Sequence, residues 1–146
     1  MTVIHRTSIW KVPKIALNIL RHPFEQNPLA IFFNEPVHYL STADGKIQSY
    51  CVLVHHRSYA QLKDVFTFPA HRGQGLATRL IEKVIEPVKT PVYLYCPSTR
   101  VSFYERLGFR RTLQASIKLK ILAALGSFFS QIVKGRRVVI MKRDVY

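Results

Sequence analysis

The sequence predicts one α+β domain over residues 1–146, with a mixed β-sheet of about six strands flanked by helices. Three observations lead to this fold class. An Asp-Gly pair at residues 44–45 separates two strand-like runs, an amphipathic helical pattern starts after Gly75, and Val92–Cys96 is an almost continuous apolar run. Such a run is typical of a central strand that is covered on both sides. The length suits a single compact domain.

Residues 1–36 are expected to form one or two short helices. Apolar residues recur at helical spacing over 15–20, and Pro23 and Pro28 interrupt the pattern. A loop is therefore expected at His22–Asn27.

A hairpin should follow, because glycine in the pair Asp44-Gly45 adopts positive φ at little steric cost. A third strand, Gln61–Phe68, should end at Pro69, which has no N–H to donate to a sheet. The next helix begins after Gly75. Its apolar positions, which mark one face, are 76, 77, 80, 81, 84 and 85.

After the strand Val92–Cys96, residues 98–109 are expected to form a short helix. Ser98 or Thr99 would cap its start, and Gly108 would lie just past its end. Residues 136–143 should form the closing strand. The segment Ser116–Gly135 between them is largely apolar, and we expect its part 117–133 to be a core or dimer helix; a segment that rests on lipid or gates the substrate site is the alternative.

The chain is strongly basic, with 22 Lys and Arg against 8 Asp and Glu and a formal net charge of +14. The charge is concentrated at the two ends, since residues 1–22 contain no acid and residues 115–146 contain only Asp144. Such a surface attracts polyanions, which include nucleotide cofactors, nucleic acid and anionic lipid. A soluble basic surface without a specific partner is the plainer interpretation.

The two cysteines, Cys51 and Cys96, lie in apolar strand-like runs and are expected to be buried, reduced thiols. No metal-ligand spacing is present, so we expect no metal. The N-terminus has no secretory signal pattern, and the stretch 117–133 contains too many polar residues to be expected to span a membrane. We therefore expect a cytoplasmic protein, with association to a membrane surface left open.

The segment around Gly73 and Gly75 has the properties of a phosphate site. A helix start offers unpaired N–H groups and a partial positive charge, two glycines let a ligand approach the backbone, and Arg72 adds a cation. The segment lacks the Gly-Lys-Ser/Thr of a P-loop, and Thr78 stands where a dinucleotide fingerprint needs Gly or Ala.

Two motifs carry a family resemblance. Arg72, Gly75 and Ala77 form an Arg-x-x-Gly-x-Ala pattern, and residues 103–109 read Phe-Tyr-Glu-Arg-Leu-Gly-Phe. Both are similar to motifs of the GNAT superfamily of acyl-CoA-dependent N-acetyltransferases, and they occur in the same order. The resemblance covers roughly residues 38–111 and the final strand.

The resemblance implies a sheet that splays at a gap holding acetyl-CoA, between the strand that ends at Pro69 and the strand 92–96. Residues 1–36 would lie on the acceptor side, 37–111 would form the core with the acyl-CoA site, and 112–146 would hold the apolar insertion and closing strand. The pantetheine would pair with the backbone of one strand, and the pyrophosphate would rest on the loop that follows. The implied cofactor residues are Val65, Phe66, Thr67, Arg72, Gly73, Gln74, Gly75, Leu76, Ala77 and Thr78.

The resemblance also implies catalytic roles. Tyr104 falls at the position that protonates the leaving thiolate, and a phenol of pKa ~10 can donate to a thiolate whose conjugate acid has a pKa of ~8.5. A strand N–H near Thr67 would hold the oxyanion. Asp64 is our candidate base, with His55 and His56 as alternatives. Pro97 stands where many members carry Asn, so it lacks the side-chain amide that contacts the cofactor in those members.

We therefore expect an enzyme that moves an acetyl group from acetyl-CoA to a primary amine. The acceptor would be a small molecule or a protein amine, and a homodimer through 117–133 is compatible with this function. The alternative is a non-catalytic basic module of the same fold that holds CoA, nucleic acid or an anionic membrane surface.

Overall fold

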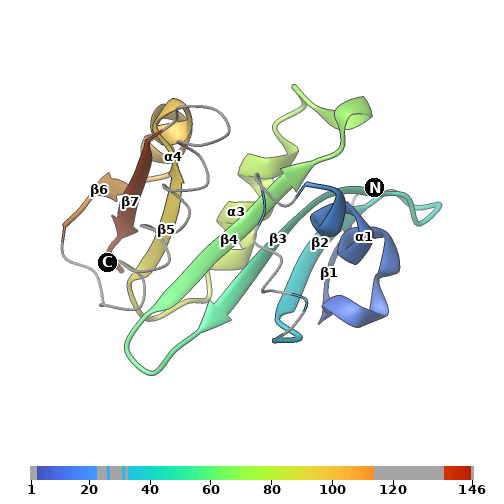
Figure 1. Cartoon of the computed structure of the whole chain (residues 1–146), viewed down its shortest axis with the longest axis horizontal. Helices are drawn as coiled ribbons and strands as arrows, with labels where there is room; N and C mark the ends of the chain where they lie inside the picture. The colour runs from blue at the N-terminus through green and yellow to red at the C-terminus, as the bar shows by residue number, and fades with distance from the viewer. Residues whose placement is uncertain (1–2, 23–25, 27–30, 32, 114–136, 146) are drawn as a thin grey trace. The chain divides into compact units, whose positions relative to one another are not determined.

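The computed structural model describes residues 3–22, 26, 31, 33–113 and 137–145 (Figure 1). The chain divides into two compact units. Unit 1 comprises Met1–His55 and Leu62–Val88, and unit 2 comprises His56–Gln61 and Lys89–Tyr146. The organisation as one domain stays a prediction.

The described strands form a mixed sheet in the order β1-β2-β3-β4-β5-β7-β6, seven strands where the sequence predicted about six. β4 (Ala60–Thr67) pairs in parallel with β5 (Val92–Pro97) at the start of both strands, where Ala60 lies opposite Val92 and Gln61 opposite Tyr93. The gap implied by the family resemblance would involve later residues of these strands, which belong to different units, and it stays a prediction.

The prediction of helices alone for residues 1–36 was wrong at its start, because Val3–Ser8 forms the edge strand β1. This strand pairs antiparallel with β2 (Pro36–Ser41), which pairs antiparallel with β3 (Ile47–His55). The β-branched residues of β1 favour a strand. Because β1 lies at the sheet edge and remains largely exposed, it lacks the alternation of apolar and polar residues that marks a half-buried strand.

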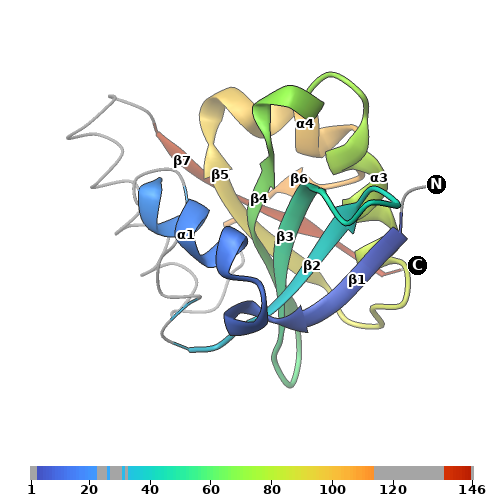
Figure 2. The ribbon, with the colours of Figure 1, turned by 90° about the vertical axis from the view of Figure 1, so that its right-hand side faces the viewer.

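Two helices cover opposite faces of unit 1 (Figure 2). A 3-10 turn, η1 (Ile9–Lys11), leads into α1 (Pro13–Arg21), which confirms a helix in the N-terminal third. Ile15 and Ile19 of α1 are fully buried in one core with Tyr50 of β3. On the other face lies α3 (Leu76–Ile85), which confirms the amphipathic pattern. Its buried residues are Leu76, Leu80, Ile81, Val84 and Ile85.

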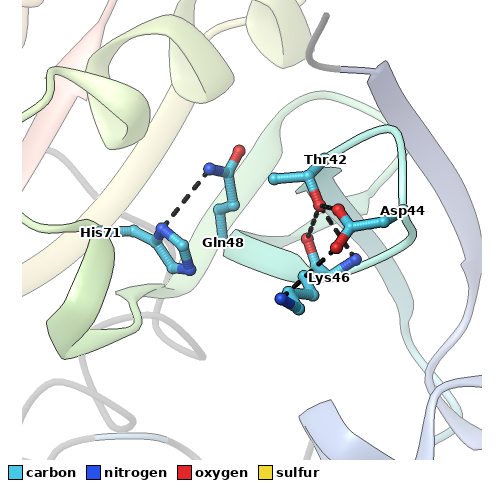
Figure 3. Close-up of polar contacts among 5 residues, drawn as sticks. All are labelled: Thr42, Asp44, Lys46, Gln48 and His71. Atoms are coloured by element: carbon cyan, nitrogen blue, oxygen red, sulfur yellow. Dashed lines mark hydrogen bonds and ion pairs between the residues drawn. The ribbon is translucent and has the colours of Figure 1, made fainter.

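The hairpin between β2 and β3 is confirmed. Gly45 has φ +79°, and its N–H donates to the Thr42 carbonyl at 2.9 Å. Thr42 organises the loop, because its hydroxyl donates to the Asp44 carboxylate and accepts the Lys46 N–H at 3.1 Å (Figure 3). The Thr42 bond is the main reason that the pKa of Asp44 lies below its usual value.

Unit 2 is built on β5 and β7 (Val138–Arg143), which pair antiparallel along the whole of β5. The short strand β6 (Arg110–Arg111) flanks β7. The expected helix after β5 consists of a 3-10 turn, η3 (Ser98–Arg100), and α4 (Val101–Glu105). The cap prediction was wrong, because the 3-10 turn places Arg100 at the cap position of α4 and no side chain caps either element. Gly108 lies past the end of α4 and has φ +85°, a left-handed conformation that glycine adopts without steric cost.

Cys51 and Cys96 are free and buried, as predicted. The segment 116–135, including the stretch 117–133 assigned to a dimer or lipid contact, lies outside the described residues. Among the helices that are described, none is long and apolar enough to cross a membrane.

Candidate active site

The predicted phosphate loop lies in unit 1, between the 3-10 turn η2 (Pro69–His71) and α3. Gly73 and Gly75 have φ of +76° and +68°, a region that side-chain-bearing residues rarely occupy. A Cβ atom placed on either glycine would have no heavy atom beyond its chain neighbours within 4 Å. Glycine is therefore required by the backbone conformation, and the surface of the loop is open to a ligand.

The start of α3 leaves donors for an anion. The Arg79 N–H donates to the Gly75 carbonyl at 3.1 Å, and Gly75, at the cap position, makes no side-chain cap bond. The N–H groups of Leu76, Ala77 and Thr78 therefore have no acceptor within the helix. No acidic side chain occurs in the first turn to oppose the positive end of the helix dipole.

Arg72 is held at the edge of this loop. Its Nε donates to the Thr67 carbonyl at 3.0 Å, and its guanidinium carbon lies 5.5 Å from the centre of the Phe66 ring. The preceding residue, His71, is tied to β3, because its Nδ1 lies 3.4 Å from Nε2 of the buried Gln48 (Figure 3). A guanidinium carries five N–H donors, so the bond from Nε leaves the terminal groups able to bind an anion.

The predicted pantetheine strand, Val65–Thr67, is the half-buried end of β4. The Ser49 hydroxyl of β3 donates to the Phe66 carbonyl at 3.0 Å and lies 3.0 Å from the Thr67 hydroxyl. With Arg72 on the Thr67 carbonyl, both of these carbonyls already have protein partners. The pairing of a ligand with this strand stays a prediction.

Asp64 lies inside β4 with an unusual backbone conformation. It has φ +52°, which is unusual for a residue other than glycine and more so within a strand. The side chain is half-buried, and its charge contributes to raising the pKa of Tyr50 and of Cys51 above their usual values, after the larger effect of burial. The neighbouring Lys63 forms an ion pair with Glu35 at 2.6 Å.

An aromatic cluster at this end of β4 was not predicted. Phe66 packs on Tyr50 at 5.7 Å and on Phe68 at 5.4 Å between ring centres, and the Lys14 ammonium lies 4.8 Å from the centre of the Phe68 ring. The Tyr50 hydroxyl accepts a hydrogen bond from Asn18 at 2.9 Å and donates one to Gln26. These partners are 32 and 24 positions from Tyr50, so no local pattern signals the network.

The two alternative bases, His55 and His56, are both exposed. His55 ends β3 in unit 1, whereas His56 belongs to unit 2, where its ring stacks on Tyr59 at 4.4 Å. No cluster of three or more His, Cys, Asp or Glu residues that could hold a metal occurs among the residues with assigned positions.

Tyr104 belongs to unit 2 and is half-buried on α4. Its ring packs edge-on against Phe103 at 4.9 Å and Phe109 at 5.9 Å. Its carbonyl accepts the N–H groups of Leu107 at 3.0 Å and of Phe109 at 3.1 Å, so the end of the Phe-Tyr-Glu-Arg-Leu-Gly-Phe motif folds back on the helix. Leu107 and Phe109 are buried, so this end of the motif contributes to the core.

The chain matches a known protein family over the residues described above. The sequence model of the acetyltransferase (GNAT) domain family matches residues 34–111, which is more than half of the chain. The protein belongs to the GNAT acetyltransferase family. The matched range contains the loop 72–78, Asp64 and Tyr104.

Solved structures agree on the fold. An IAA acetyltransferase from Bacillus cereus has a TM-score of 0.73 at 15% identity, with 99% of this chain and 100% of that chain covered. The ribosomal-protein-S18-alanine N-acetyltransferase from Escherichia coli has a TM-score of 0.72 at 17% identity, with 99% and 94% covered. The N-acetylglutamate synthase from Neisseria gonorrhoeae, complexed with coenzyme A and N-acetyl-glutamate, has a TM-score of 0.72 at 16% identity; all of this chain aligns with 35% of that one. A search of curated proteins found no match.

Proposed function

We propose that the protein is an acetyl-CoA-dependent N-acetyltransferase that acts on a primary amine. The observation that carries this proposal is the start of α3, where two glycines at positive φ and an uncapped helix end present bare N–H groups next to Arg72. This arrangement suits a diphosphate, and it lies within the part of the chain that matches the family.

Acetyl-CoA is the co-substrate that fits these residues. Arg72 and the N–H groups of residues 73–78 would hold its pyrophosphate, because an anion gains both hydrogen bonds and the favourable end of the helix dipole there. Backbone groups of residues 65–67 would position the pantetheine arm. When bound, the co-substrate supplies the activated acetyl group.

In the proposed reaction the amine nitrogen forms a bond to the thioester carbon, and the bond between that carbon and sulfur breaks. Asp64 accepts the proton that the amine loses, directly or through a water molecule. Tyr104 donates its phenolic proton to the departing thiolate, since its reference pKa of ~10 exceeds the ~8.5 of a thiol. The products are the N-acetylated amine and free CoA.

The acceptor that we propose is neutral or acidic. A net charge of +14 repels a lysine-rich acceptor, whereas an acidic small molecule, a protein N-terminus or an aminoacyl-tRNA avoids that repulsion. A homodimer through residues 117–133 remains part of the proposal.

Calorimetry with CoA at low ionic strength tests the cofactor site. We expect the parent protein to give heat of binding and Arg72→Gln to give less. Arg57 is an exposed arginine of unit 2, so the control variant Arg57→Gln should give the same heat as the parent. Incubation with acetyl-CoA and a panel of amines, scored for released thiol, then tests turnover. If CoA gives no heat of binding, the proposal is wrong. If CoA binds but no amine leads to thiol release, the protein is a non-catalytic module.

A further inference from the structure

The outer side of η1 and α1 exposes three large apolar residues. Trp10 is 60% exposed, Leu17 48% and Leu20 54%. We refer to these three residues as the η1–α1 apolar surface. They contrast with Ile9, Ile15 and Ile19 on the same two elements, which are fully buried in the core.

The exposed residues are not needed to complete the core. Leu17 and Leu20 are three positions apart on α1, so they are neighbours on one face of the helix. The opposite side of α1, with Ile15 and Ile19, already faces the sheet. Helix α1 therefore has an apolar side toward the core and a second apolar strip toward the solvent.

Basic residues lie at both ends of this strip, and its own segment, residues 1–22, contains no acidic residue. Lys11 ends η1 and Arg21 ends α1, and both are exposed. Lys14 is also exposed and places its ammonium over Phe68. Residues 1–22 contain no Asp or Glu. The cations that flank the apolar side chains therefore have no acidic residue within their own segment, residues 1–22.

We propose that the η1–α1 apolar surface binds the interface of an anionic phospholipid membrane. The leucines and the indole would enter the boundary between headgroups and acyl chains, where Trp is favoured because its ring is apolar and its N–H is polar. Lys11 and Arg21 would contact the anionic headgroups. The nine-residue helix would lie on the surface rather than cross it.

Charge complementarity favours this partner over an apolar protein groove. A groove of another protein would bury Leu17 and Leu20 but would not require cations at both ends of the strip. An anionic membrane satisfies both features, and the chain's net charge of +14 attracts such a surface over a longer range.

Trp10 makes the test direct, because it is the single tryptophan of the chain. The full-length protein is titrated with vesicles of phosphatidylcholine alone or mixed with phosphatidylglycerol. With the anionic vesicles we expect a blue shift of Trp10 emission and quenching by lipids that carry a quencher in the acyl chain. Raising the salt from about 0.1 M to about 1 M should weaken binding, since the Debye length falls from ~10 Å to ~3 Å.

Three double variants separate the contributions. Leu17→Glu with Leu20→Glu should lower the vesicle partition constant at least about tenfold, because two apolar side chains no longer enter the lipid. Lys11→Glu with Arg21→Glu should lower it similarly for anionic vesicles. Arg57→Glu with Lys89→Glu is the matched control, since it makes the same change of charge at exposed positions of unit 2 and should lose much less binding than either of the other two variants.

Four results would overturn the inference: an unshifted Trp10 emission, equal loss in the control, binding of RNA in place of vesicles, or a Trp10 that is shielded from aqueous quenchers before vesicles are added. The last result would mean that another part of the chain or a second copy covers the surface. Heat of CoA binding, measured on the Leu17→Glu, Leu20→Glu variant, should be unchanged, so failure of this inference is distinguishable from failure of the proposed enzymatic function.

Discussion

Lys63 on β4 and Glu35, just before β2, form an ion pair in which the Lys63 nitrogen lies 2.7 Å and 2.6 Å from the two carboxylate oxygens. The side chains are only 7% and 12% exposed. Because each charge has lost most of its water, each depends on the other for stabilisation. The ion pair therefore joins β4, at the residue before Asp64, to the segment that precedes β2.

Glu35→Gln should lower the free energy of unfolding by about 3–5 kcal/mol, because it leaves the Lys63 ammonium buried without a counter-charge. Urea unfolding at neutral pH measures the change. Lys83→Met is the control. It removes an ion pair with Glu86 whose side chains are 65% and 67% exposed, and it should cost less than about 1 kcal/mol. Equal losses in both variants would show that burial does not strengthen the dependence between Lys63 and Glu35.

Gly75→Ala should destabilise the protein by about 1–2 kcal/mol and also weaken CoA binding, because alanine is strained at φ +68° and the loop would shift. Gly45→Ala is a matched control with φ +79° in the β2–β3 hairpin, so it carries the strain without touching the loop. Thermal unfolding and calorimetry with CoA separate the two effects. If Gly45→Ala weakens CoA binding as much as Gly75→Ala does, the weaker binding results from lower stability and not from a change in the loop.

His38 should make stability depend on pH in the acid range. Burial, followed by the charges of Arg6 and His55, lowers the pKa of His38 from 6.5 to about 4, and its buried Nδ1 has no hydrogen-bond partner among the described residues. Between these pH values the unfolded chain binds a proton that the folded chain does not. Stability is therefore full above pH 6.5 and falls as the pH drops toward 4.

We expect this contribution to reach about 1–2 kcal/mol, after allowance for solvent screening of a partly exposed ring. Urea unfolding at a series of pH values measures it, and NMR of the imidazole protons locates the titration. The variant His38→Gln should flatten the curve over this range. An unchanged slope would assign the effect to other groups.

Tyr104→Phe should lower kcat at least about tenfold while leaving the ring packing against Phe103 and Phe109 in place, because only the phenolic proton is lost. Asp64→Asn should lower kcat as well, since the amide cannot accept a proton. Released thiol measures turnover. Tyr59→Phe removes a hydroxyl elsewhere in unit 2 and should be silent. Full activity of Tyr104→Phe would mean that water protonates the thiolate.

The parts of the fold with local signals were predictable. The Asp44-Gly45 hairpin depends on one residue at positive φ, and α3 depends on apolar spacing over ten residues. The loop with Gly73 and Gly75 was predictable for the same reason, because glycine at a helix start carries its own conformational signal. The family motifs added the assignment of Tyr104.

Features that depend on distant partners were not predictable. β1 takes its strand form from pairing with β2 rather than from an apolar alternation of its own. Glu35 meets Lys63 across 28 positions, and Tyr50 meets Asn18 across 32, so composition and spacing give no sign of either contact. The positive φ of Asp64 was equally hidden, because aspartate adopts this conformation more readily than most residues but only at a small fraction of positions.

The burial of the two cysteines determines the background of the proposed thiol-release assay. Cys51 is completely inaccessible and Cys96 only 3% exposed. Burial raises the pKa of Cys96 to about 12, and it also raises the pKa of Cys51. A cysteine reacts with a colorimetric disulfide reagent when its thiolate attacks the reagent's sulfur, so the buried, protonated thiols of the native protein contribute almost no background. Each coloured product molecule then corresponds to one released CoA. An increasing signal in the absence of acetyl-CoA would show that the protein unfolds and exposes its cysteines.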